Sequence, residues 1–350
     1  MARILVLIIC LILLSTGLHA QSSGPLHIKV TDYGFLTSFP ALQTILDDYL
    51  KTVEADLNKQ QPIEDIDRVI KSTANSTALS SRGIGTDHAS KFDRFLLGLS
   101  LGAAADLDRN VGLKDQIAGI GGSASILLGT KLNKKTDLFF NVGSLSHSKT
   151  FDGVMGTNLD SEITTNNAGI HLRYNFLDGS GDDMWGWTGL NVSTGYEYNR
   201  NKLSFEDVLA EDVNVDLGGQ AVLQGRLKGK PQYTITSETH TIPVEVFSAV
   251  NFLKFFSVFG GAGADFNFGR SEGSGNVKAN AFSPLTCVSG VCTNLNLPQA
   301  QITGDLNSHK NVDPFFFRGF AGLQLNLGHV KLYGEVNRVF GTQLTGVNFG

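Results

Sequence analysis

The chain has 350 residues, a formal net charge of -5 and 41% hydrophobic residues, among them 23 phenylalanines. With a pI near 5.9, it lacks the basic surface by which proteins bind nucleic acids, so we expect no nucleic-acid partner. The negative net charge also argues against tight electrostatic binding to anionic lipid headgroups. The length allows one large domain or two small ones.

The first 20 residues are typical of a cleaved export signal. Arg3 supplies the positive start, residues 4–14 are continuously apolar, and Ala20 ends a more polar stretch at a small residue. The apolar run is too short to cross about 30 Å of hydrocarbon as a helix. We therefore predict that residues 1–20 are removed during export.

Residues 21–92 form an N-terminal segment with helical periodicity. Ser38 can cap a helix with Pro40 in its first turn. Apolar residues follow at helical spacing: Leu42, Ile45, Leu46, Tyr49, Leu50, Val53 and Leu57. A second short helix is predicted from Pro62, and residues 72–90 are rich enough in Ser, Thr, Gly and Asn to predict a linker.

Residues 93–350 are dominated by two-residue alternation. In residues 168–176, apolar side chains occupy every second position, which gives a strand one apolar and one polar face. Similar segments lie near 95–103, 118–128, 138–142, 190–198, 242–252, 256–268, 315–327, 330–336 and 345–349. On an exported chain, they predict an all-β fold, an antiparallel up-and-down transmembrane barrel of about ten strands, with 8–12 possible.

Short and long connections alternate between these segments. Short ones lie at 133–135, 178–183, 254 and 328–329, and long ones lie at 106–115, 148–163, 200–231 and 271–312. Outer-membrane barrels have short periplasmic turns and long outer loops, so both ends of the barrel should face the periplasm. One detail disturbs the pattern, because Tyr233 and Ile235 alternate out of phase with Ile242. A bulge near His240 or an extra strand is therefore expected.

Two cysteines remain after the predicted cleavage, Cys287 and Cys292. The sequence around Ser289-Gly290 is nearly palindromic, and these two residues suit a two-residue hairpin turn. Cys287 would then face Cys292 at a non-hydrogen-bonded position, where the spacing is compatible with a disulfide. We predict this disulfide; two free thiols are the alternative.

Residues 316–350 resemble the C-terminal hairpins of bacterial outer-membrane β-barrel proteins. Those proteins usually finish in an alternating apolar strand with a terminal aromatic residue, and this chain has Val347 and Phe349 before its last residue, Gly350. The resemblance implies an outer-membrane location, contact with outer-membrane lipids and insertion by the barrel-assembly machinery. It identifies no subfamily.

The polar faces of the predicted strands carry charges of both signs. These candidates for the barrel lumen are His171, Arg173, Glu197, Glu245, Asp265, Arg318, Lys331 and Glu335. His171 with Ser193 and Asn191 invites comparison with a hydrolase triad, but a hydrogen-bonded lumen explains the three residues better. No cofactor or metal motif stands out, so we predict no cofactor, no metal and no enzymatic activity.

Two classes of function fit these observations. A narrow selective pore or transport barrel, with a small solute as partner, is the first expectation. A surface-exposed adhesin or structural envelope barrel that acts through its outer loops on a host or surface ligand is the alternative. The N-terminal helical segment could plug the lumen, cap the periplasmic mouth or dock elsewhere. An obstructed lumen with large ordered outer segments would favour the alternative.

Overall fold

A computed structural model describes residues 27–350, except for 39, 61–62, 83–87, 90–93, 107–118, 155–156, 182–183, 207–208, 217–221, 254, 282–284, 289–290 and 295–299. The predicted export signal lies outside the described residues. No helix in the described part of the chain combines the length and the apolar character that a membrane span requires.

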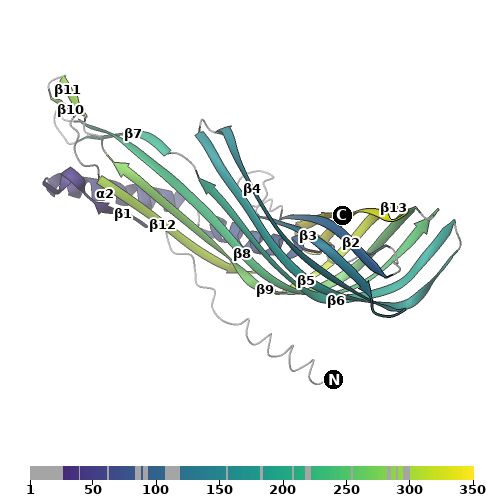
Figure 1. The fold of residues 1–350 in the computed structure, drawn as a ribbon. Helices are drawn as coiled ribbons and strands as arrows, with labels where there is room; N and C mark the ends of the chain where they lie inside the picture. Colours follow the sequence, from purple (N-terminus) through teal and green to yellow (C-terminus); the bar gives the residue numbers. More distant parts are fainter. Residues whose placement is uncertain are drawn as a thin grey trace.

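Ten antiparallel strands of the described residues close into a ring (Figure 1). In ring order they are β2 (Phe95–Asp106), β3 (Gly119–Lys131), β4 (Thr136–Val154), β5 (Thr157–Gly181), β6 (Trp185–Glu206), β8 (Val222–Phe252), β9 (Phe256–Ala281), β13 (Phe315–Leu327), β14 (Val330–Val339) and β15 (Leu344–Phe349). β8 pairs with β9, and β15 pairs with β2, which completes the ring. The predicted barrel of ten strands is confirmed.

The barrel has an apolar outer surface and a polar interior. Along β2, Phe95, Leu97 and Leu99 point outward with exposed fractions of 79%, 74% and 72%, whereas Arg318 and Asp265 inside the ring are both 0% exposed. Water would strongly disfavour such an outer surface, but the hydrocarbon of a membrane matches it. The alternation therefore produces a barrel of the outer-membrane type.

The predicted irregularity near His240 is wrong. β8 pairs with β9 in one unbroken register from Lys228 to Phe252. Ile235 lies on the same face as the lumen residues, but at a level above the barrel, where its partner Gly273 lies against the Ile70 side chain of an N-terminal helix. The apolar residues change phase because the inner face of the sheet meets this helix there.

The strands of the ring differ greatly in length. β2, β3, β13, β14 and β15 have 6 to 13 residues, whereas β4, β5, β6, β8 and β9 have 19 to 31. The longer strands continue beyond one end of the barrel as a sheet (Figure 1), which we call the outer extension. Shorter strands add to it: β1 (His27–Asp32), β7 (Leu209–Asp216), β10 (Leu285–Val288), β11 (Val291–Asn294) and β12 (Ala300–Asn311).

The outer extension replaces most of the long loops expected at 148–163, 200–231 and 271–312. Much of each segment is paired strand, so the prediction of loops was wrong there. Residues 144–149 are exposed on both faces of the sheet, so no period of two appears in their polarity. The extension lies at the end with long connections, and the short turns lie at the opposite end of the barrel, which we call the short-turn end.

The hairpin of β10 and β11 has the predicted register. Val288 pairs with Val291, and Cys287 pairs with Cys292. The turn residues Ser289 and Gly290 lie outside the described residues, as do the cysteine side chains, so the disulfide stays a prediction.

We expect a non-reduced digest of the exported protein to contain one peptide pair joined through Cys287 and Cys292, because opposed residues of a hairpin have Cβ atoms at disulfide distance. Mass spectrometry before and after reduction measures this. Full alkylation of both thiols without reductant would exclude the disulfide.

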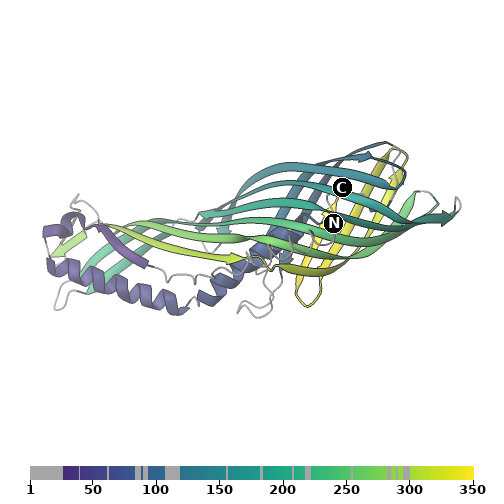
Figure 2. The same ribbon diagram turned by 90° about the horizontal axis from the view of Figure 1, so that it is seen from below.

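The N-terminal segment contains the 3-10 helix η1 (Gly34–Ser38) and the helices α2 (Pro40–Gln60) and α3 (Ile63–Ser80). Figure 2 shows α2 beside the outer extension and α3 leading into the barrel. Glu54 of α2 accepts a hydrogen bond of 2.9 Å from the backbone N–H of Ile28 in β1. The linker predicted from residue 72 is wrong as far as Ser80, because α3 continues through these small residues.

Candidate functional site in the barrel lumen

The structure places the predicted lumen residues on the inner face of the ring. Seven have exposed fractions between 0% and 5%: His171, Arg173, Glu197, Glu245, Asp265, Arg318 and Glu335. Lys331 lies on the same face of β14 as Glu335 but near the short-turn end, and it is only half-buried. A buried charge is stable only when an opposite charge and hydrogen bonds compensate its loss of water. The stability of the lumen therefore depends on how these groups pair.

Arg318 is the centre of a buried ion-pair network. Its guanidinium donates hydrogen bonds to Asp265 at 2.8 Å, to the amide oxygen of Asn337 at 2.5 Å and to Glu245. Ser193 donates a further hydrogen bond of 2.7 Å to Glu245. One residue of β13 thus connects β9, β8 and β14 across the interior, which sequence spacing alone could not reveal.

His88 completes this network, although it was not predicted. Its Nδ1 lies 3.0 Å from Glu335 and its Nε2 lies 3.4 Å from Glu245. The phenylalanines Phe247, Phe259 and Phe320 surround the imidazole, with ring centroids 4.6, 5.6 and 5.1 Å away. In the sequence, His88 is a single histidine in a predicted linker and gives no signal, because its partners lie more than 150 residues away.

A second cluster surrounds His171, one of the three residues that were compared with a hydrolase triad. His171 Nε2 lies 2.5 Å from Glu197 Oε1, and Asn141 donates to the same carboxylate at 3.2 Å. In the strand register, His171 stands opposite Gly195, whereas Ser193 stands opposite Arg173 and bonds to Glu245. The cluster therefore has the geometry of a cross-strand ion pair.

Helix α3 lies against the inner wall through a ridge of small residues. Ser72, Ser76 and Ser80 follow each other at intervals of four and share one helix face. Opposite them, a Cβ at Gly119 would lie 2.3 Å from the Ser72 backbone, and one at Gly121 would lie 2.4 Å from the Ser76 backbone. The small side chains that suggested a linker therefore allow a helix to fit within a narrow barrel.

Hydrogen bonds join this helix to the wall. The amide of Asn199 donates to the Thr77 carbonyl at 2.9 Å and to the Ser80 hydroxyl at 2.8 Å. Ser123 donates to the Ser80 carbonyl at 2.6 Å, and Asn201 donates to the Thr77 hydroxyl at 3.2 Å. These bonds satisfy polar groups that would otherwise be buried without partners.

The contacts of the N-terminal segment descend through the barrel in chain order. Ile70 lies against β9 in the outer extension, Ser80 contacts β3 within the barrel, and His88 contacts Glu335 midway along β14. The first barrel strand then starts at Phe95 at the short-turn end. The segment therefore runs through the lumen from the outer extension to the opposite mouth.

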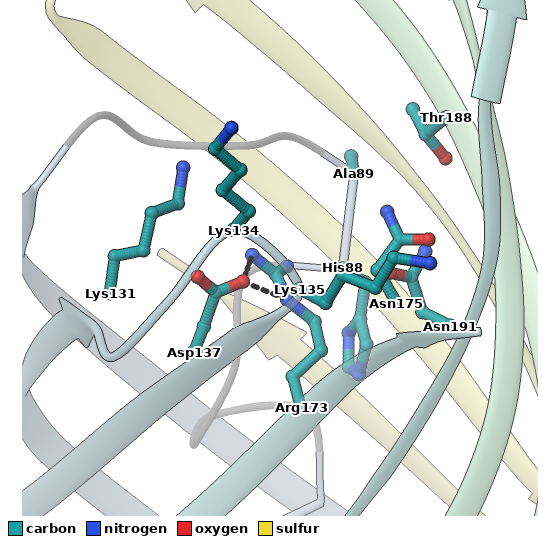
Figure 3. A pocket seen from close by; sticks show the side chains of 10 residues that line it. All are labelled: His88, Ala89, Lys131, Lys134, Lys135, Asp137, Arg173, Asn175, Thr188 and Asn191. Atoms are coloured by element: carbon teal, nitrogen blue, oxygen red, sulfur yellow. Dashed lines mark hydrogen bonds and ion pairs between the residues drawn. The ribbon is translucent and has the colours of Figure 1, made fainter. Parts of the chain in front are cut away.

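A small hollow lies at the short-turn end of the lumen. Figure 3 shows the side chains that line it. Its volume is about 20 Å³, which is enough for about one water molecule. The guanidinium of Arg173 on β5 donates hydrogen bonds of 2.9 and 2.7 Å to Asp137, its register partner on the neighbouring strand β4. Three lysines line the hollow beside this pair: Lys131, Lys134 and Lys135. Basic side chains therefore gather at this end of the lumen.

Comparisons with solved structures give several similar chains. CarO of Acinetobacter baumannii is 16% identical, with 59% of this chain and 96% of that chain covered and a TM-score of 0.25. The translocator domain of the autotransporter NalP from Neisseria meningitidis is 8% identical, with 74% and 87% covered and a TM-score of 0.27. Ail, the attachment invasion locus protein of Yersinia pestis, is 7% identical, with 63% and 100% covered and a TM-score of 0.22.

No curated protein matches the chain. The family comparison is more informative, because it covers nearly the whole chain after the predicted export signal. Residues 26–350 match the Lsa36-like family, so a single family includes the N-terminal helices, the outer extension and the barrel. The chain is a ten-stranded β-barrel of the outer-membrane type that belongs to the Lsa36-like family.

Proposed function

We propose that this protein is a closed outer-membrane barrel that acts at the cell surface through its outer extension and N-terminal unit, as a non-enzymatic binding or structural platform. By the N-terminal unit we mean residues 27–60, with β1, η1 and α2. The observation that carries the proposal is the passage of α3 through the lumen. The function therefore corresponds to the alternative expectation from the sequence.

Closure of the lumen is the first support. The described part of α3 from Ser72 to Ser80 is buried throughout, and the small-residue contacts with β3 leave no space between the helix and that wall. Below the helix, the network around Arg318 and His88 extends across the interior. A solute path would require α3 to leave the wall that it contacts.

The outer extension is the second support. A transmembrane strand needs only about 9–11 residues, whereas the five long strands have 19 to 31. With short turns in the periplasm, the surplus projects outside the cell. The N-terminal unit pairs with this surplus, since β1 forms a ladder with β12. The outer extension and the N-terminal unit would then be exposed together at the cell surface.

The narrow pore remains the rival function, since charged residues of both signs line the lumen. It differs in one requirement, namely that the N-terminal segment leaves the lumen. Permeability of the full-length protein therefore separates the two functions.

Liposomes that contain the full-length protein should swell in an isotonic sugar solution no faster than protein-free liposomes, because α3 blocks the path. Heat-dependent mobility on a denaturing gel should confirm that the liposomes contain the folded protein. A lack of swelling then cannot result from a lack of inserted protein. Swelling at the rate of a general porin, at matched insertion, would contradict the closed-barrel proposal and favour transport.

A further inference from the structure

The outward face of the long strands changes from apolar to charged within two successive rows of side chains. On β8, the outward positions from Val250 to Ile242 are apolar apart from Ser248, over about the 9–11 residues that cross a membrane. The next row is aromatic: Tyr198, His240 and Phe268 stand side by side in the strand register. Such a row is typical of the membrane–water interface.

The following row is charged. Arg200, Glu238 and Arg270 are adjacent on β6, β8 and β9, all on the outward face. Arg270 also lies 2.6 Å from Glu272, one position further out. Two guanidinium and two carboxylate groups therefore meet at the level where lipid headgroups lie.

These residues line a hollow of about 700 Å³ in the outer surface. It forms where β9 exchanges its neighbour, from β13 below to β12 above. Gly269 adopts a φ of 118° at this exchange, and Asn311, Val312 and Pro314 border the hollow. The size is within the range of about 300–1,000 Å³ that is usual for small-molecule pockets.

We propose that this hollow binds the headgroup of a zwitterionic phospholipid of the outer leaflet, one that carries a phosphodiester and a primary ammonium. Guanidinium groups bind phosphate oxygens bidentately, which assigns the phosphodiester to Arg200 and Arg270. The carboxylates of Glu238 and Glu272 attract the ammonium, and the ring of Phe268 can contact it through its face. A purely anionic headgroup would bring no cation to Glu238 or Glu272.

The test measures lipid retention by the full-length protein. The purified protein in detergent is offered phosphatidylethanolamine or phosphatidylglycerol with identical acyl chains, and retained lipid is counted by native mass spectrometry. We expect a preference of about tenfold for phosphatidylethanolamine. Arg200→Gln and Arg270→Gln should each lower the retention of both lipids, because both lipids carry the phosphodiester. Glu238→Gln should remove most of the preference for phosphatidylethanolamine, because Glu238 attracts the ammonium that phosphatidylglycerol lacks.

Lys202→Gln is the matched control, since Lys202 is exposed on the same face of β6 one position further out but does not line the hollow. It should bind lipid like the wild type. Equal retention of both lipids, preference for phosphatidylglycerol, or variants that bind like the Lys202 control would overturn the site. Free O-phosphoethanolamine should compete only weakly, since it lacks acyl chains; competition as strong as that of the lipid would overturn the assignment to a membrane lipid.

Discussion

Gly121→Val is expected to open the barrel. A Cβ at this position would lie 2.4 Å from the backbone of Ser76, which cannot move aside as a flexible side chain can. Valine suits a strand, so the wall should persist while α3 is displaced from it. In planar bilayers we expect single-channel steps from this variant and none from the wild-type chain.

Gly122→Val provides the matched control. Gly122 is the next residue of β3, and the nearest atom to a Cβ there is 3.9 Å away, so the variant should stay closed. Deletion of residues 21–92 should give the same steps as Gly121→Val if the helix alone blocks the path. Equal conductance of the two glycine variants would contradict the claim that the contact between α3 and β3 closes the lumen.

Arg318→Met is expected to cause the largest loss of stability among single substitutions in the lumen. The change removes the cation that Asp265 and Glu245 share, and leaves both carboxylates buried. Breaking a buried ion pair by removal of one partner typically costs about 3–5 kcal/mol. The free energy of unfolding, measured by urea titration of the folded protein in detergent, should fall by this amount.

Arg270→Met is the comparison for this prediction. Arg270 pairs with Glu272 at the surface, where the side chains are 62% and 55% exposed. Exposed pairs contribute about 0–1 kcal/mol, so this variant should unfold close to the wild type in the absence of added lipid. Similar losses from both variants would show that burial of the Arg318 network adds nothing to stability.

The barrel strands could be predicted because alternation of polarity is a local property of the chain. Phe95, Leu97 and Leu99 can be assigned to the outer face from the sequence of their own strand alone. Each of the ten barrel strands was predicted in this way. The outer extension lacks this signal, because above the membrane both faces of residues 144–149 are exposed. A strand with two polar faces resembles a loop in sequence.

The interior was harder to predict because its contacts join distant residues. Which residues face the lumen followed from the alternation, but the partners of Arg318 come from three other strands. Ser72, Ser76 and Ser80 indicate a linker when read alone. Only their contacts with Gly119, Gly121 and Gly102 on the first two barrel strands explain them as a helix surface.

Surface labelling of single cysteines tests most directly whether the N-terminal segment passes through the lumen to the cell surface. Lys51→Cys in α2, with a native side chain 76% exposed, and Lys134→Cys, in the turn between β3 and β4, are compared in a chain that also carries Cys287→Ser and Cys292→Ser. On intact cells, a membrane-impermeant maleimide should label the cysteine at position 51 and leave that at position 134 unlabelled until the outer membrane is permeabilised. Labelling of position 51 only after permeabilisation would contradict the threaded barrel.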